Sequence, residues 1–202
     1  MKCAGLVLCG GQSRRMGTPK EWLCIGNERM LQRVVRLVAT AAEPVAIVAA
    51  PGQSLPELPP SITIHYDAAN GRGPLEGLAT GLAALPSSVE LVFAIGTDSP
   101  LLKPAWINRL IELIGENDLA IPHVDGFHHP LAAVYRRATV LPAIERLRAN
   151  GRSALVDIVE AVRTRLVTAD ELREVDPELA TLRNLNTPED YYAALADAGE
   201  PW

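Results

Sequence analysis

The N-terminal run Cys3–Cys9 is apolar throughout and stops at the glycine pair Gly10-Gly11. It does not alternate apolar with polar residues, so both of its faces need cover from solvent. A short strand that is buried on both faces is typical of the interior of a parallel sheet with helices on either side. This one run therefore predicts an α/β fold.

The rest of the chain alternates between strand-like and helix-like patterns. Only 4% of the residues are aromatic, so the core must be aliphatic, which suits a parallel sheet covered by helices. We expect strands at 45–50, 62–66, 91–95, 119–122 and 131–135, and helices at 30–41, 75–85, 104–114, 140–149, 154–162 and 191–198. This order predicts a three-layer αβα sandwich with a mainly parallel, Rossmann-like sheet, in which ligands bind beyond the carboxyl ends of the strands.

Length and charge narrow the class of protein. The chain has 202 residues and no convincing linker, so we expect a single domain over 1–202, with the proline-rich stretch 51–60 as a surface loop. The net charge of −5 argues against nucleic acid or an anionic membrane as a partner. The chain has three cysteines but no CxxC pair. It also shows no signal-peptide pattern and no apolar run long enough to span a membrane. We therefore expect a cytoplasmic protein.

The loop after the first run, from Leu8 to Lys20, concentrates glycine and positive charge. Adjacent glycines let the backbone approach a ligand closely, and their N–H groups can point at an anion. Arg15 and Lys20 add cations that suit phosphate oxygens. The spacing is neither GxxxxGK[ST] nor GxGxxG, so Walker-A and dinucleotide-binding loops are excluded. The plain alternative is a glycine-rich turn with solvated basic residues.

Two carboxylates follow predicted strands. Asp98 ends the run FAIGTDSP, where a carboxylate projects toward the ligand crevice and suits a hard cation such as Mg²⁺. Asp67 follows the strand at 62–66 and precedes a glycine-rich turn that ends in Gly73 and Pro74, at the start of a helix. The alternative for each carboxylate is a residue that stabilises a turn.

Other polar residues are weaker candidates. Asn184 and Asn186 flank Leu185 in an extended stretch, so both amides would lie on the same face. They could equally satisfy backbone groups ahead of Thr187, the expected cap of the last helix. His129 has no ligand cluster around it, and a structural role is its default. Arg152, after a helix, could bind a phosphate or be an ordinary solvated arginine.

The ordered motifs resemble those of the molybdenum cofactor guanylyltransferases, within the MobA-like nucleotidyltransferases. These motifs are LVLCGGQSRRMG with Lys20, then GPLEGLATGL from Gly73, the Asp98-Ser99-Pro100 strand end, HPLAAVY from His129, and NLNTPEDY from Asn184. They span nearly the whole chain in the expected order. The resemblance implies a nucleotide-diphospho-sugar transferase type of fold, with a nucleotide-binding half at about 1–100 and an acceptor-binding half at about 101–202.

The resemblance also implies roles for single residues and for partners. It assigns catalysis to Arg15, Lys20 and Asp98, and Mg²⁺ binding to Asp98 and Asn186. It assigns the nucleotide to Leu8, Cys9, Gly10, Gly11, Lys20, Asp67, Gly73 and Asp98, and the acceptor to His129, Arg152, Asn184 and Asn186. The expected reaction is attack by the phosphate of molybdopterin on the α-phosphorus of GTP, which releases pyrophosphate. We expect a monomer or weak oligomer that contacts other molybdenum-cofactor proteins transiently.

The choice of base stays open at three positions. Cys9 replaces the usual alanine, Ala49 and Ala50 stand where an asparagine is common, and Thr18-Pro19-Lys20 is more like the cytidylyltransferases. The pair Gly10-Gly11 and the GPLEG turn favour guanine. The alternatives are a CTP-dependent molybdopterin enzyme, a sugar-phosphate nucleotidyltransferase, and a nucleotide-binding module without transfer activity.

Overall fold

The run Cys3–Cys9 forms strand β1, and every residue of it is buried. The computed structural model describes residues 2–10, 18–67 and 73–197. β1 pairs in parallel with β4 (Val45–Ala49) on one side and with β6 (Leu91–Gly96) on the other. The prediction of a central strand that is covered on both faces is therefore confirmed.

The sheet extends outward from these three strands in the order β10-β7-β9-β6-β1-β4-β5. β9 (Ala132–Arg136) runs antiparallel to β6 and to β7 (Leu119–Val124), so β7 points the same way as β1. The carboxyl ends of β1, β4, β6 and β7 consequently share one edge of the sheet. The remaining strands are β5 (Thr63–Tyr66), parallel to β4; β10 (Thr164–Thr168), parallel to β7; and β8 (Phe127–His128), antiparallel to β7.

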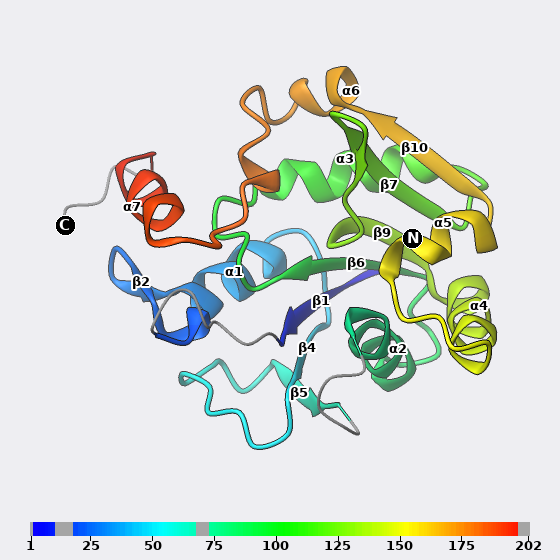
Figure 1. Cartoon of the computed structure of the whole chain (residues 1–202), viewed down its shortest axis with the longest axis horizontal. Helices are drawn as coiled ribbons and strands as arrows, with labels where there is room; N and C mark the ends of the chain where they lie inside the picture. The colour runs from blue at the N-terminus through cyan, green and yellow to red at the C-terminus, as the bar shows by residue number, and fades with distance from the viewer. Residues whose placement is uncertain (1, 11–17, 68–72, 198–202) are drawn as a thin grey trace.

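Helices cover both faces of the sheet and make the three predicted layers (Figure 1). One buried cluster joins the sheet to α1 (Met30–Ala39), α3 (Pro104–Ile114) and α6 (Ala169–Arg173). The other cluster joins it to α2 (Pro74–Ala84), α4 (Arg137–Ala149) and α5 (Ile158–Ala161). None of the described helices has the length and hydropathy that a membrane crossing requires.

A third, smaller cluster brings the C-terminal helix to the N-terminal part of the chain. Leu185 and residues of α7 (Pro188–Asp197) pack with Ile25 of β2 (Cys24–Ile25) and Met30 of α1. β2 forms a hairpin with β3 (Glu28–Arg29). Figure 1 shows α7 beside β2, although the two are far apart in the sequence. This packing brings the segment before α7 close to the carboxyl ends of the strands.

Several local predictions need correction. The helix expected at 154–162 is a short 3-10 helix η2 (Leu155–Asp157) followed by α5, which ends at Ala161. The Thr164 hydroxyl donates to the carbonyls of Val159 and Val162, which turns the chain into β10. β10 has one buried residue and gave no clear signal. The segment at 175–182 holds the 3-10 helix η3 (Ala180–Leu182), whose first N–H groups donate to Asp176.

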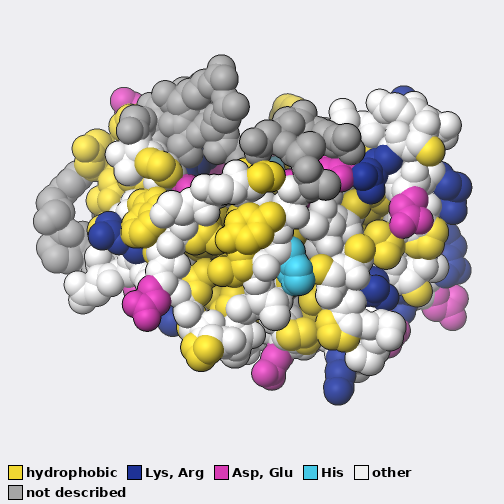
Figure 2. All heavy atoms as spheres, turned by 90° about the horizontal axis from the view of Figure 1, so that it is seen from below, with side chains coloured by type: hydrophobic (Ala, Val, Ile, Leu, Met, Phe, Trp, Pro, Cys, Tyr) yellow, Lys and Arg dark blue, Asp and Glu magenta, His cyan; other side chains and the backbone are white. Residues whose placement is uncertain are grey.

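The face seen from below in Figure 2 carries hydrophobic side chains near its centre. The edge strand β5 lies on this side of the molecule in Figure 1, and it exposes Ile64 and Tyr66. Two exposed apolar side chains on an edge strand are ordinary for a protein surface. This face lies beside the strand that leads to Asp67.

Gly81 allows α2 to lie directly on β1. A Cβ atom at this position would stand 2.4 Å from Cδ1 of Leu6, which is fully buried. At Gly77, one turn earlier, the nearest atom would be Oδ2 of Asp67 at 3.6 Å, an ordinary contact. Close packing of the helix on the sheet is therefore the role of Gly81.

We expect Gly81→Ala to lower the free energy of unfolding by about 1–3 kcal/mol because it overpacks the contact with Leu6. Gly77→Ala is the matched control and should stay within about 1 kcal/mol of the parent, since alanine favours helix and meets no clash. Urea unfolding followed by circular dichroism measures both. Equal effects of the two substitutions would contradict this account of the packing.

Candidate active site

Polar side chains from distant parts of the chain meet beyond the carboxyl ends of β1 and β6. The two strand ends are joined by Thr97, whose backbone N–H and hydroxyl both donate to the carbonyl of Leu8, at 3.1 and 3.3 Å. The chain then leaves the sheet at Asp98. The prediction that Asp98 follows the carboxyl end of a strand is therefore confirmed.

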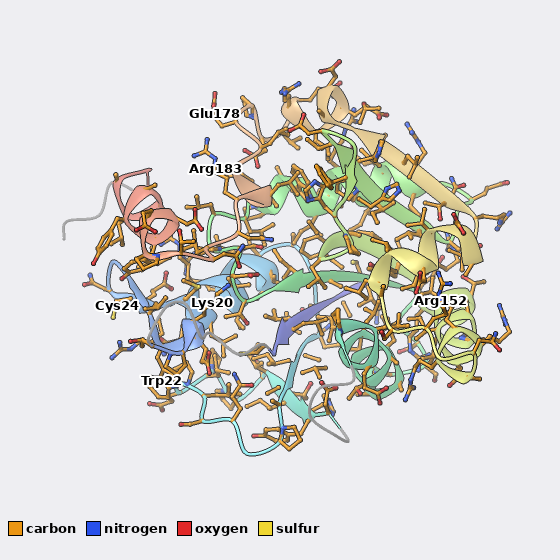
Figure 3. The ribbon with its side chains drawn as sticks, viewed as in Figure 1. Lys20, Trp22, Cys24, Arg152, Glu178 and Arg183 are labelled. Carbon is orange, nitrogen blue, oxygen red and sulfur yellow. The ribbon has the colours of Figure 1, made fainter. Side chains whose placement is uncertain are left out.

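Lys20 is the centre of this group. Its Nζ atom lies 3.1 Å from Oδ2 of Asp98 and 2.8 Å from Oδ1 of Asn186. The Lys20 and Asp98 side chains are 18% and 26% exposed, so the pair is partly shielded but open to a ligand. Lys20 belongs to the 3-10 helix η1 (Lys20–Trp22), and Figure 3 shows it beyond the tips of β1 and β6. Three candidates from the sequence thus come together.

The segment that carries Asn186 is tied to the end of β6. The N–H of Leu185 donates to the carbonyl of Asp98 at 2.8 Å, and the Ser99 hydroxyl donates to Oδ1 of Asn184 at 2.8 Å. Leu185 is buried while Asn184 and Asn186 are exposed, as the alternation predicted. Ser99 was not a candidate from the sequence. Its place directly after Asp98 is the signal that could have identified it.

Asp190 holds the same segment from the helix side. Its Oδ2 atom accepts from the N–H groups of Asn186 and Thr187, at 3.0 and 2.9 Å, and these bonds lower the pKa of its carboxyl group. The N–H of Asp190 donates in return to the Thr187 hydroxyl. Thr187 is therefore the cap of α7, as predicted, and the reciprocal bonds fix the peptide next to Asn186.

Asp67 directly follows β5, at the edge of the sheet where the carboxyl ends of β4 and β5 lie. Its N–H donates to the carbonyl of Ala49, which joins the ends of β5 and β4. Its Oδ1 atom is buried and has no hydrogen-bond partner in the described structure. Burial raises the pKa of this carboxyl group, with the Thr80 hydroxyl acting in the opposite direction. A buried acceptor without a donor is costly, so a ligand that donates here would be favoured.

The described part of the glycine loop is Leu8, Cys9 and Gly10. Cys9 is buried, which raises the pKa of its thiol to about 12, so it stays protonated and is not a nucleophile. Around Gly10, a Cβ atom would meet no atom of the described residues within 4 Å. The candidates Gly11 and Arg15 lie outside the described residues.

Gly73 and Arg152 border a different hollow. A cavity of about 670 Å³ lies between the start of α2 and the end of α4, lined by Gly73, Glu76, Glu145, Arg148, Ala149, Gly151, Arg152 and Ser153. Gly73 has φ 84°, and its Cβ position lies 3.1 Å from the carbonyl oxygen of Ser153. Arg152 donates twice to Asp157, and Figure 3 shows it on the opposite side of the view from Lys20. The structure does not bring Arg152 to the Lys20 group.

His129 lies at the ligand edge. Its N–H donates to the carbonyl of Pro122, and its own carbonyl accepts from Ala132, which pairs with Ile95 of β6. Burial lowers the pKa of His129, which favours the neutral form of its imidazole. The neighbouring His128 stacks on His123, with ring centroids 4.7 Å apart. No group of three or more His, Cys, Asp or Glu among the described residues could hold a metal ion.

Comparisons with known proteins show the family to which the chain belongs. Residues 5–166 match the family model of the MobA-like NTP transferase domain. A probable molybdenum cofactor guanylyltransferase of Mycobacterium avium is 37% identical over 98% of this chain and 97% of its own length. A protein of the same description from Mycobacterium tuberculosis is 38% identical over 83% of this chain and 84% of its own.

Solved structures share the fold. Molybdopterin-guanine dinucleotide biosynthesis protein A of Archaeoglobus fulgidus superimposes with a TM-score of 0.79 at 21% identity, over 98% of this chain and 99% of that one. 2-C-methyl-D-erythritol 4-phosphate cytidylyltransferase of Thermus thermophilus gives 0.71 at 19% identity, over 96% and 98%. With the family match and the near full-length relatives, these findings show that the chain belongs to the MobA-like NTP transferases and is a nucleotidyltransferase.

Proposed function

We propose that this protein transfers GMP from GTP to the phosphate of molybdopterin and releases pyrophosphate. The observation that carries the proposal is the Lys20 ammonium between Asp98 and Asn186 at the ligand edge of the sheet. Nucleotidyl transfer needs charge neutralisation on the phosphates at this edge. The substrates follow from the full-length relatives, which are named as probable molybdenum cofactor guanylyltransferases.

The oxygen atoms around Lys20 fit Mg²⁺. Mg²⁺ takes hard oxygen ligands and needs only one or two carboxylates when substrate phosphates supply the rest. Asp98 offers a carboxylate oxygen and Asn186 an amide oxygen, and both atoms accept a hydrogen bond from the Lys20 ammonium group. These two residues would hold the ion. When bound, it would supply positive charge to the phosphates during transfer.

The chain's own groups would act by positioning and charge. Lys20, and Arg15 from the glycine loop, would bind phosphate oxygens and stabilise the charge that builds on the leaving pyrophosphate. A phosphate monoester has a second pKa of about 6, so the attacking phosphate is mostly ionised at neutral pH and no general base is required. The Cys9 thiol, whose pKa burial raises to about 12, would stay protonated and take no part in proton transfer.

The two substrates would occupy different parts of the ligand edge. Leu8, Cys9, Gly10, Gly11, Asp67 and Gly73 would bind the nucleotide, within a half that spans about 1–100. Asn184, Asn186, His129 and Arg152 would bind the acceptor, within the half of about 101–202. Arg152 is paired with Asp157 and lies away from Lys20, so it would contact a part of the acceptor distant from the reacting phosphate.

Asp67 supports guanine as the base. Its buried Oδ1 atom has no donor among the described residues, and guanine carries a ring N–H next to an exocyclic amino group, which together suit one carboxylate. Cytosine offers a carboxylate only its exocyclic amino group. A CTP-dependent enzyme of the same fold is the second candidate, because Pro19 and Ala50 depart from the guanylyl pattern.

We expect Asp98→Asn to reduce pyrophosphate release from GTP and molybdopterin by at least about 100-fold, because the carboxylate that would hold Mg²⁺ is lost and with it the positive charge of the ion at the phosphates. The matched control is Asp170→Asn, on a side chain that is 94% exposed in α6. Both variants should melt at the temperature of the parent. Near-parental turnover by Asp98→Asn would refute the role of Asp98.

Pyrophosphate release measured across the four nucleoside triphosphates, with molybdopterin supplied, tests the choice of substrate. We expect GTP to be preferred over CTP by about tenfold or more, the effect of one hydrogen bond to a charged group. A preference for CTP would establish the cytidylyl alternative. Binding of GTP without pyrophosphate release would indicate a module that binds nucleotide but does not transfer it.

We expect Asp67→Asn to raise the free energy of unfolding at pH 7 while weakening GTP binding by about tenfold. The folded-state pKa of Asp67 is raised, so its favourable contribution to stability is present below the ordinary pKa of 3.8 and is lost as the pH rises. The stability difference between variant and parent should therefore vanish as the pH falls toward 3.8. A difference that is independent of pH would contradict this assignment, and urea unfolding over a pH series measures it.

A further inference from the structure

Glu21, the residue directly after Lys20, is a buried carboxylate. It is only 6% exposed, although glutamate is rarely buried without a partner. Its Oε1 atom accepts from Nε2 of Gln53 at 2.7 Å, and the same Nε2 lies 3.6 Å from Sγ of Cys9. The side-chain oxygen of Gln53 accepts in turn from the N–H of Ala50 at 2.9 Å. One amide therefore connects η1 to the ends of β1 and β4.

The sequence explains how Gln53 reaches this place. Ala50-Pro51-Gly52-Gln53 is a turn in which the N–H of Gln53 donates to the carbonyl of Ala50 at 3.1 Å. Gly52 has φ 73°, and proline followed by a glycine with positive φ is typical of a type II turn. The turn directs the Gln53 side chain back over the end of β4. The first turn of the proline-rich loop therefore places Gln53 where it hydrogen-bonds to η1.

A second tether acts on the other side of η1. The indole N–H of Trp22 donates to the carbonyl of Ser54 at 3.0 Å, and Nη1 of Arg29 donates to the carbonyl of Trp22 at 2.9 Å. The Arg29 guanidinium also lies 5.9 Å from the centre of the Trp22 ring. A single turn of 3-10 helix has little stability of its own. Its orientation is consequently set by these side-chain contacts.

We propose that Glu21 and Gln53 are positioning residues that aim Lys20 at Asp98 and Asn186; this rests on the proposed role of Lys20. Lys20 leaves η1 toward the ligand edge, while Glu21 leaves it toward Gln53. A buried carboxylate without its donor is costly, so the Gln53 bond fixes the rotation of η1. A lysine that is oriented before the nucleotide arrives loses less freedom on binding.

The contact can be broken and rebuilt by exchanging its two side chains. Gln53→Glu places two carboxyl groups together and should lower kcat for pyrophosphate release from GTP by about tenfold or more, the cost of one lost bond to a charged group. The double variant Glu21→Gln with Gln53→Glu restores an amide and a carboxylate and should recover most of the parental rate. Gln32→Glu is the matched control, since Gln32 donates to the carbonyl of Glu57 in the same loop without touching Glu21.

A double-mutant cycle with Lys20→Ala separates positioning from general stability. If Gln53 acts through Lys20, Gln53→Glu should change GTP affinity by less than about twofold in the Lys20→Ala background, because coupled residues are not additive. Calorimetry with GTP and Mg²⁺ provides this readout without the acceptor. If Gln53→Glu does not fold, Trp22→Phe removes the second tether and enters the same cycle.

The outcomes distinguish the two proposals. A parent that neither binds GTP nor releases pyrophosphate overturns the proposed function and the inference with it. An active parent with an unchanged Gln53→Glu variant overturns the inference alone. The inference is also overturned if Gln53→Glu lowers GTP affinity equally in the parent and in the Lys20→Ala background. It is overturned as well if the exchanged pair does not recover activity. Recovery by the exchanged pair together with non-additivity supports the inference.

Discussion

The ammonium group of Lys20 lies where three remote parts of the chain meet. Lys20 comes from the start of the chain, Asp98 from the middle and Asn186 from near the C-terminus. One ion pair and one hydrogen bond at the surface would not assemble such a site, because exposed pairs contribute little. The packing of Leu185 with Ile25 and Met30, and the bond from the N–H of Leu185 to the carbonyl of Asp98, also hold these segments together. The polar contacts with Asp98 and Asn186 fix the orientation of the Lys20 side chain.

Much of the fold could be predicted because local patterns and tertiary demands agree. The buried run Cys3–Cys9 and the helix at 104–114 were predicted with their observed bounds, since an apolar strand or a proline-started amphipathic helix is a strong signal. β10 and η1 were missed because each is short and depends on its neighbours. Val167 is the one buried residue of β10, and η1 is anchored through side chains far along the chain.

The candidate site also contains residues that could be predicted from the sequence and residues that could not. Asp98 and the alternating pair Asn184 and Asn186 could be predicted because strand ends and extended segments have fixed directions. The convergence of Asp98 and Asn186 on Lys20 depends on tertiary packing and cannot be read from the spacing of the motifs. Glu21 and Gln53 have no motif of their own, and their roles appear only when their hydrogen-bond partners are known. The loop at 51–60 was expected to lie at the surface, yet its first turn supports the site.

The departures from the guanylyl pattern can be understood together. Without a polar side chain at Ala49 or Ala50, the end of β4 has no side-chain amide of its own for a ligand. Gln53 returns an amide to this point, but its oxygen is used by the N–H of Ala50 and its nitrogen by Glu21. Both polar atoms of the Gln53 amide are therefore already hydrogen-bonded within the protein, and neither is left to bind a nucleotide base. Under the proposed function, discrimination between bases would then depend on Asp67, whose buried Oδ1 atom is without a donor in the described structure, and on the backbone at Gly10.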